Sequence, residues 1–212
     1  MKNTIILLLC ILAALSLSAQ QTESIAVKTG REHKGFFLSM SLGPNFPSIT
    51  DEVVNSYNYK FTGTGLLFDF KIGGAVKEDF ILHATITSAS MPGPRITSEG
   101  SSLHLSNNLS LGEAMIGGGF TYYMMPQNIF FSASVGMGNF TLIDNDNETS
   151  ISTDRGISLQ LKAGKEWWVS KRWGLGIALV YGKTSLTNSP TNGLDELMNS
   201  NNIAVVFNAT LN

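Results

Sequence analysis

The sequence has little cysteine, little charge and few long apolar runs, and these shortages exclude several classes of protein. Its 212 residues include one cysteine, and only 14% of them are charged, against about 25% in ordinary soluble domains. Disordered chains combine low hydrophobicity with high charge, so a chain that is 43% hydrophobic does not belong with them. A net charge of −2 also argues against a strongly basic nucleic-acid-binding protein.

The one long apolar run lies at the N-terminus and has the pattern of a secretory signal peptide. A short basic start is followed by apolar residues 5–15 and then by small and polar residues. The run is shorter than the roughly 20 residues that a membrane-spanning helix needs. We therefore predict a signal peptide over residues 1–19 and a short periplasmic lead over residues 20–34. Because Cys10 lies inside the run, the mature chain is expected to be exported without disulfides.

The rest of the chain alternates apolar with small or polar residues, the pattern of strands that have two different faces. Eight segments alternate in this way: 36–43, 65–72, 80–87, 113–122, 129–138, 157–164, 173–182 and 203–211. One face is bulky and apolar, whereas the other is mostly Ser, Thr and Gly with few charges. A small polar interior and an apolar exterior suit a narrow closed barrel in lipid, and closure leaves no unpaired strand edge in the hydrocarbon. We predict an all-β, eight-stranded antiparallel up-and-down transmembrane β-barrel over residues 35–212.

The connections between these segments alternate in length, which predicts the orientation of the barrel. Short connections at 77–79, 126–128 and 170–172 alternate with long ones at 44–61, 92–106, 144–155 and 187–201. Outer-membrane barrels have short periplasmic turns and long extracellular loops. Ten strands remain an alternative if the first long loop contains a hairpin.

Aromatic residues flank the short connections, as expected for a girdle at the level of the lipid headgroups. The predicted girdle consists of Phe80, Tyr122, Tyr123, Phe130, Phe131, Trp167, Trp168 and Trp173. The segment Gly164-Lys165-Glu166-Trp167-Trp168-Val169-Ser170-Lys171-Arg172-Trp173-Gly174-Leu175-Gly176 has a strand ending in Trp, a tight turn and a Trp-Gly restart. With this segment and the eight alternating strands, the chain resembles the bacterial outer-membrane β-barrel domain family, the small eight-stranded barrels of OmpA/OmpX type. The resemblance implies the fold and an outer-membrane location, but no activity.

A few charged residues fall on the inward faces of the predicted strands, and we treat them as the candidate site. They are Asp69, Lys71, Glu113, Lys162 and Glu166. A buried charge needs a partner, so these residues are expected to form a network of ion pairs across the lumen. The network is interpreted either as a structural plug or, alternatively, as a gate for small ions.

The sequence offers little for catalysis, and we expect no enzymatic activity and no cofactor. A hydrolase needs a nucleophile, a base and an orienting acid within mutual reach. His33, His83 and His104 are the candidate bases, with serines near His104, but there is no G-x-S-x-G elbow. The segment 144–148 resembles the first half of a calcium loop, but position six is Thr149 and position twelve is Arg155. We therefore expect no metal site of that type.

The expected outer loops contain nine carboxylates and three basic residues, which makes them acidic. The expected partners are outer-membrane lipids, periplasmic chaperones, the barrel-assembly machinery and an extracellular ligand that binds the loops. No nucleic acid is expected, and the barrel is expected to be a monomer. The predicted function is a non-enzymatic structural or surface-interaction role. A narrow, porin-like pore is the main alternative, and a lipid-modifying or soluble lipid-binding barrel is a further one.

Overall fold

The barrel described here is a computed structural model covering residues 31–53, 57–190 and 194–212. The predicted signal peptide, residues 1–19, and most of the predicted lead lie outside these ranges. Eight long strands cross the barrel: β1 (Phe36–Val53), β3 (Gly65–Lys77), β4 (Phe80–Pro92), β7 (Leu109–Met124), β8 (Ile129–Asp144), β10 (Gly156–Trp168), β11 (Trp173–Asn188) and β12 (Glu196–Leu211). None of the described residues forms a helix long and apolar enough to cross a membrane.

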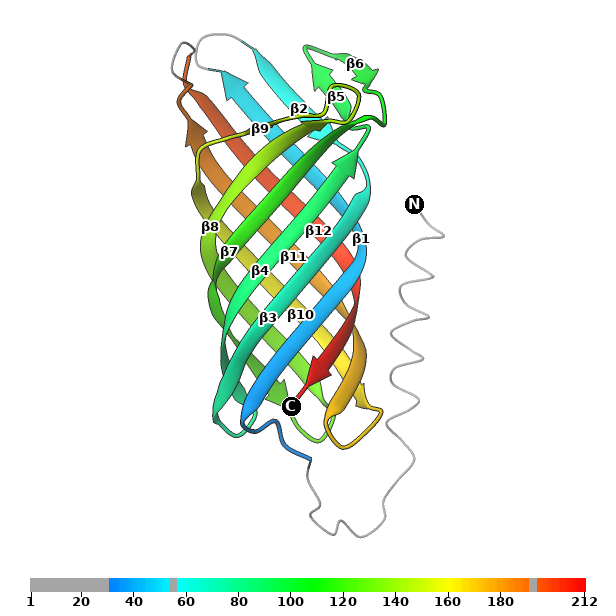
Figure 1. The fold of residues 1–212 in the computed structure, drawn as a ribbon, viewed down its shortest axis with the longest axis vertical. Helices are drawn as coiled ribbons and strands as arrows, with labels where there is room; N and C mark the ends of the chain where they lie inside the picture. The colour runs from blue at the N-terminus through cyan, green and yellow to red at the C-terminus, as the bar shows by residue number, and fades with distance from the viewer. Residues whose placement is uncertain (1–30, 54–56, 191–193) are drawn as a thin grey trace. The chain divides into compact units, whose positions relative to one another are not determined.

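The eight strands form one closed antiparallel sheet (Figure 1). Each strand pairs with its neighbours in the order β1-β3-β4-β7-β8-β10-β11-β12, and β12 pairs back with β1. This last pairing runs from Leu38–Leu211 to Val53–Glu196, so every long strand has a partner on both sides. The eight-stranded architecture predicted from the sequence is confirmed.

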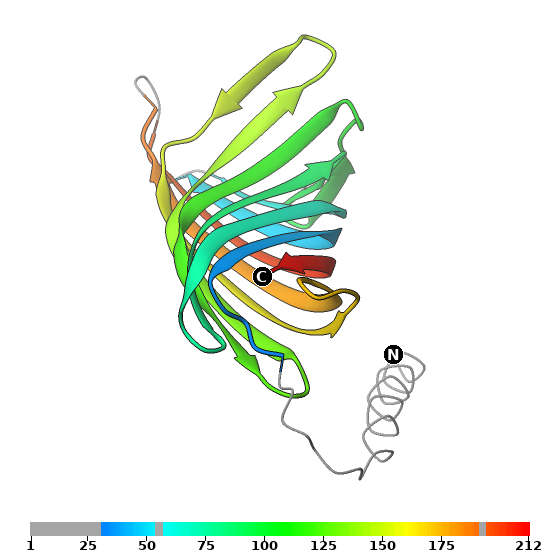
Figure 2. The same ribbon diagram turned by 60° about the horizontal axis from the view of Figure 1, so that its bottom comes forward.

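The two ends of the barrel differ, because one has tight turns and the other has additional strands (Figure 2). The tight turns connect β3 to β4, β7 to β8, and β10 to β11. Asp79 and Asn128 in these turns have positive φ angles of 62° and 55°, a conformation that Asp and Asn tolerate better than most residues. We call this the turn end, and the opposite end the loop end.

At the loop end, four short strands occur where the sequence predicted long connections. They are β2 (Asn58–Thr62), β5 (Arg95–Ser98), β6 (Ser101–His104) and β9 (Thr149–Ser152). β3 pairs with β1 only up to Asn45, whereas β1 continues to Val53, so the free edge of β1 pairs with β2. β5 and β6 extend this sheet outward, and β9 pairs with β8. The first loop therefore contains a strand, but the strand does not enter the barrel wall, and the ten-stranded alternative is wrong.

The interior of the barrel contains two groups of buried apolar side chains. The group toward the loop end is Ile49, Met91, Leu111, Phe140, Leu186 and Met198, with Phe61 of β2 packed against it. The other group includes Phe37, Leu67, Ile81, Tyr123, Phe130, Val180 and Val206. The sequence predicts an inner face of mostly Ser, Thr and Gly. This prediction is wrong at both groups, where bulky apolar side chains also point into the lumen.

Candidate functional site

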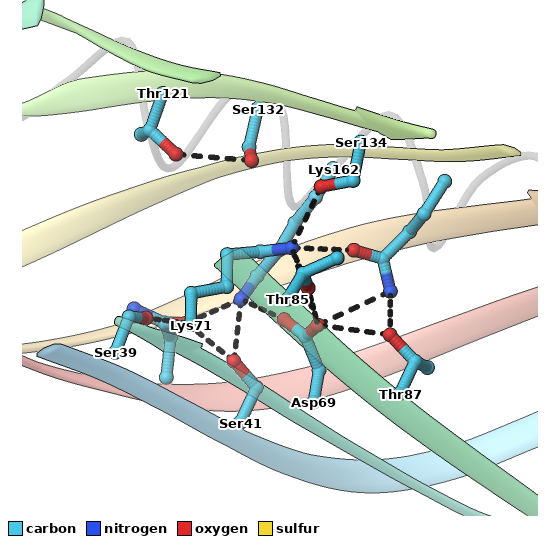
Figure 3. A network of polar contacts seen from close by, with 12 residues as sticks. Ser39, Ser41, Asp69, Lys71, Thr85, Thr87, Thr121, Ser132, Ser134 and Lys162 are labelled. Carbon is cyan, nitrogen blue, oxygen red and sulfur yellow. Dashed lines mark hydrogen bonds and ion pairs between the residues drawn. The ribbon is translucent and has the colours of Figure 1, made fainter. Parts of the chain in front are cut away.

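Asp69 is the centre of a buried polar network inside the barrel (Figure 3). Its carboxylate is fully buried and contacts two ammonium groups, with Lys71 Nζ 3.2 Å from Oδ1 and Lys162 Nζ 3.0 Å from Oδ2. Thr87 Oγ1 and Gln160 Nε2 donate to Oδ1 at 3.1 and 3.3 Å. Because β3 and β10 lie on opposite sides of the barrel, these contacts join its walls across the lumen.

The two lysines extend the network to three more strands, β1, β8 and β12. Lys71 Nζ donates to Gln160 Oε1 at 2.7 Å and to the hydroxyls of Thr85 and Ser134. Lys162 Nζ donates to Asn208 Oδ1 at 2.6 Å and to Ser41 Oγ. Each ammonium group therefore has several acceptors in a place that water does not reach, which is the condition for keeping a charge buried.

Glu166 joins the network through Asn208 rather than through a lysine. Asn208 Nδ2 donates to Glu166 Oε1 at 2.6 Å, while Asn208 Oδ1 accepts from Lys162. Thr210 Oγ1 and Tyr123 Oη also donate to Glu166 Oε1, at 2.7 and 3.3 Å. The two carboxylates and two ammonium groups balance each other in formal charge.

Glu113 lies apart from this network, closer to the loop end. Its Oε1 accepts from Ser200 Oγ at 2.6 Å. Together with Asn202 it lines a cavity of about 20 Å³, which is room for about one water molecule. The structure thus brings four of the five predicted charged residues into one network and places Glu113 elsewhere.

His33 closes the barrel at the turn end, a role that sequence reasoning missed. The ring is fully buried and lies 3.5 Å from the Tyr123 ring, stacked on it. His33 Nε2 is 2.8 Å from Asn128 Oδ1, and the His33 backbone N–H donates to Asp79 Oδ1 at 2.9 Å. Nothing in a polar segment that contains one histidine signals this packing, because the partners come from two distant turns.

The residues of the predicted aromatic girdle divide between the outer wall and the interior of the barrel. Tyr122, Phe131, Trp167 and Trp173 are exposed on the outer wall, and Phe80 is half-buried and stacks on Phe120. Tyr123 and Phe130 are only 1% and 2% exposed and point into the lumen. Successive side chains of a strand alternate between its faces, so one member of each aromatic pair has to face inward. Trp168 is also half-buried, 4.9 Å from the His33 ring.

The other candidates from the sequence form no recognisable catalytic or metal centre in the described residues. His83 Nε2 contacts Thr121 and Ser132 inside the lumen, while His104 contacts Arg95 outside it. Within the described ranges, no three His, Cys, Asp or Glu side chains are placed to hold a metal ion. Asp144 instead accepts hydrogen bonds within its own turn, and the one from the Asn147 side chain lowers the pKa of that carboxyl.

The barrel is similar in fold to solved outer-membrane proteins. Neisserial surface protein A matches with a TM-score of 0.57 and 10% identity, over 84% of this chain and 96% of that chain. OprG from Pseudomonas aeruginosa matches with a TM-score of 0.49 and 11% identity, over 85% and 98%. OmpT, an outer-membrane protease from Escherichia coli, matches with a TM-score of 0.40 and 11% identity, over 89% and 99%. No family model and no curated protein sequence matches the chain.

The chain therefore has the fold of a small eight-stranded outer-membrane β-barrel. Its strand pairing and its exposed apolar wall agree with this class.

Proposed function

We propose that the protein is a non-enzymatic, integral barrel of the bacterial outer membrane whose lumen is closed and whose interactions take place at the loop end. The observation that carries the proposal is the Asp69 network, which joins opposite walls through fully buried ion pairs. Two further obstructions support it: His33 at the turn end and the apolar group around Phe140 toward the loop end. An ion crossing the lumen has to displace all three.

The outer wall supports the membrane location. Between Phe36 and Phe46, β1 places Leu42, Met40 and other apolar side chains outward over 11 residues, and about 9–11 residues of a tilted strand cross a membrane. We propose that outer-membrane lipids surround this wall, and that periplasmic chaperones and the barrel-assembly machinery insert it. The additional strands at the loop end are where we place contact with an extracellular ligand.

Planar-bilayer recording of the refolded mature chain tests the closed lumen. We expect no steps of conductance above the bare membrane for the wild type. The Asp69→Asn and Lys162→Ala variants weaken only one of the three obstructions, so they are also expected to stay closed. Regular conductance steps in the wild type would instead establish the narrow-pore alternative.

A further inference from the structure

Two adjacent rows of polar and basic side chains cross the outer wall at the loop end. Strand register places Lys183, Asn201, Ser48, Thr62, Arg95 and His104 in one row, and Ser185, Asn199, Thr50, Lys60, Thr97 and Ser102 in the next. We call these twelve residues the basic wall. They include three permanent cations and one histidine, and they include no carboxylate, although the loop end as a whole is acidic.

The residues between the two rows show that the basic wall faces outward. Along β1, β2, β5 and β6 these residues are Ile49, Phe61, Ile96 and Leu103, which are aligned in register. Ile49 is buried in the apolar group inside the barrel, and Phe61 packs against it. Because neighbouring residues of a strand point to opposite faces, Lys60 and Arg95 are held on the outside.

The cations of the basic wall have no acidic partner in the part of the chain that the structure describes. None of Lys60, Arg95 and Lys183 forms an ion pair there. Arg95 Nη2 is 2.6 Å from His104 Nε2, and Nη1 donates to Ser102 Oγ at 3.4 Å. A guanidinium group has five N–H donors, so most of those on Arg95 are free for an external acceptor.

A hollow of about 470 Å³ adjoins these side chains. Arg95, His104, Thr62, Thr64 and Asn107 supply its polar lining. Two residues beyond Thr64, Leu66 is 57% exposed on the lipid-facing wall, a step of about 7 Å along an extended chain. A molecule with its polar group in the hollow can therefore lay an apolar chain along Leu66.

The rows also begin where the lipid-facing wall ends. On β1 the last outward apolar residue is Phe46, and Ser48 is the next outward position. Adjacent strands lie about 4.8 Å apart and tilt by about 40° from the barrel axis. A row that crosses the strands at right angles therefore rises roughly 3 Å along the barrel axis from one strand to the next. The basic wall thus starts at the headgroup boundary with Lys183 and rises toward His104.

We propose that the basic wall binds the phosphate groups of net-anionic lipids in the outer leaflet. The proposal rests on the membrane location given under Proposed function. It identifies the chemistry of one partner at the loop end: lipid phosphate held by Arg95, Lys60 and Lys183 and by neighbouring hydroxyl and amide groups. Unpaired cations, an adjoining hollow and a lipid-facing residue directly beside it together favour a lipid over a soluble anion.

The test measures how strongly the barrel enriches anionic lipid around this site. Because Cys10 is the one cysteine in the sequence, the mature chain with Ser106→Cys carries a single dye beside the hollow. Energy transfer to fluorescent phosphatidylglycerol is compared with transfer to fluorescent phosphatidylcholine, in phosphatidylcholine vesicles. A basic residue near a charged membrane contributes about fivefold in affinity. The Lys60→Gln/Arg95→Gln variant is therefore expected to lose preference for phosphatidylglycerol by about 30-fold.

The matched control is Lys171→Gln/Arg172→Gln, which removes the same charge from the turn end and is expected to keep the preference. Equal transfer to both lipids in the wild type, or unchanged preference in the Lys60/Arg95 variant, overturns the proposal. So does complete competition by 10 mM inorganic phosphate, since that identifies a soluble-anion site. Ion leakage from the same vesicles is recorded separately. Leakage would contradict the proposed closed lumen, but it would not bear on whether the basic wall binds lipid.

Discussion

Replacement of Asp69 by asparagine is the sharpest test of the lumen network. The substitution preserves the shape of the side chain and removes the negative charge that faces Lys71 and Lys162. Both lysines are buried, so neither gains water as a substitute partner. Removing one partner of a buried ion pair typically costs about 3–5 kcal/mol, because the remaining charge is left uncompensated.

The structure places this variant in the middle of that range. Two ammonium groups lose their common counter-ion, although Lys71 keeps Gln160 as an acceptor and Lys162 keeps Asn208. We expect the free energy of unfolding to fall by about 4 kcal/mol, close to a thousandfold change in the unfolding equilibrium. Lys162→Ala is expected to cost less, since Asp69 retains Lys71.

Urea unfolding in lipid vesicles, followed by fluorescence of the three tryptophans near the turn end, measures the change. A gel that separates folded from heat-unfolded barrel gives a second readout. The double variant Asp69→Asn/Lys162→Ala, together with the two single variants, completes a double-mutant cycle that measures the coupling between the two side chains. If the free energy of unfolding of Asp69→Asn lies within about 0.5 kcal/mol of the wild-type value, the buried ion pairs do not stabilise the barrel.

Three further predictions concern the wall, the lipid face and the lead. A Cβ added at Gly119 would lie 2.0 Å from the Ala133 carbonyl oxygen, whereas one added at Gly118 would have its nearest neighbour 3.4 Å away. Gly119→Ala should therefore lower the free energy of unfolding by at least about 2 kcal/mol and reduce the folded band on the gel. Gly118→Ala should do neither. Val135 faces lipid at the middle of β8, so Val135→Arg should cost about 2–4 kcal/mol in urea unfolding and Ile143→Arg, near the loop end, at most about 1; equal costs would contradict the assigned depth. His33→Ala removes a ring stacked on Tyr123 and should speed tryptic cleavage after Lys34 in the folded barrel, whereas His104→Ala should leave that rate unchanged; no difference between the two would argue against closure by His33.

The sequence predicted the barrel because strand alternation repeats along almost the whole mature chain. Residues such as Phe68 and Asp69 are neighbours on one strand, and period-two alternation assigns them to opposite faces without knowledge of any other strand. It also assigned Asp69, Lys71, Lys162 and Glu166 to the interior. Proximity to a turn does not place Tyr123 and Phe130 in the girdle, because the same alternation points both side chains inward.

The partners of those residues were not predictable, because they depend on register between strands far apart in sequence. Asn208 connects Lys162 to Glu166, and Gln160 connects Lys71 to Asp69. Neither amide differs in sequence from an ordinary polar strand residue. Only closure of the sheet brings them to the same depth as the charges.

Local periodicity and connection length were enough to predict the membrane barrel, its eight strands and its two faces. Three features depend on tertiary contacts: which inward charges meet, the packing of His33 into the turn end, and the four short strands that extend the loop end. Tertiary contacts also assemble the basic wall, whose twelve residues come from six strands. The physical reason is the same in each case: local patterns fix which way a side chain points, whereas contacts between distant strands depend on how the whole sheet closes.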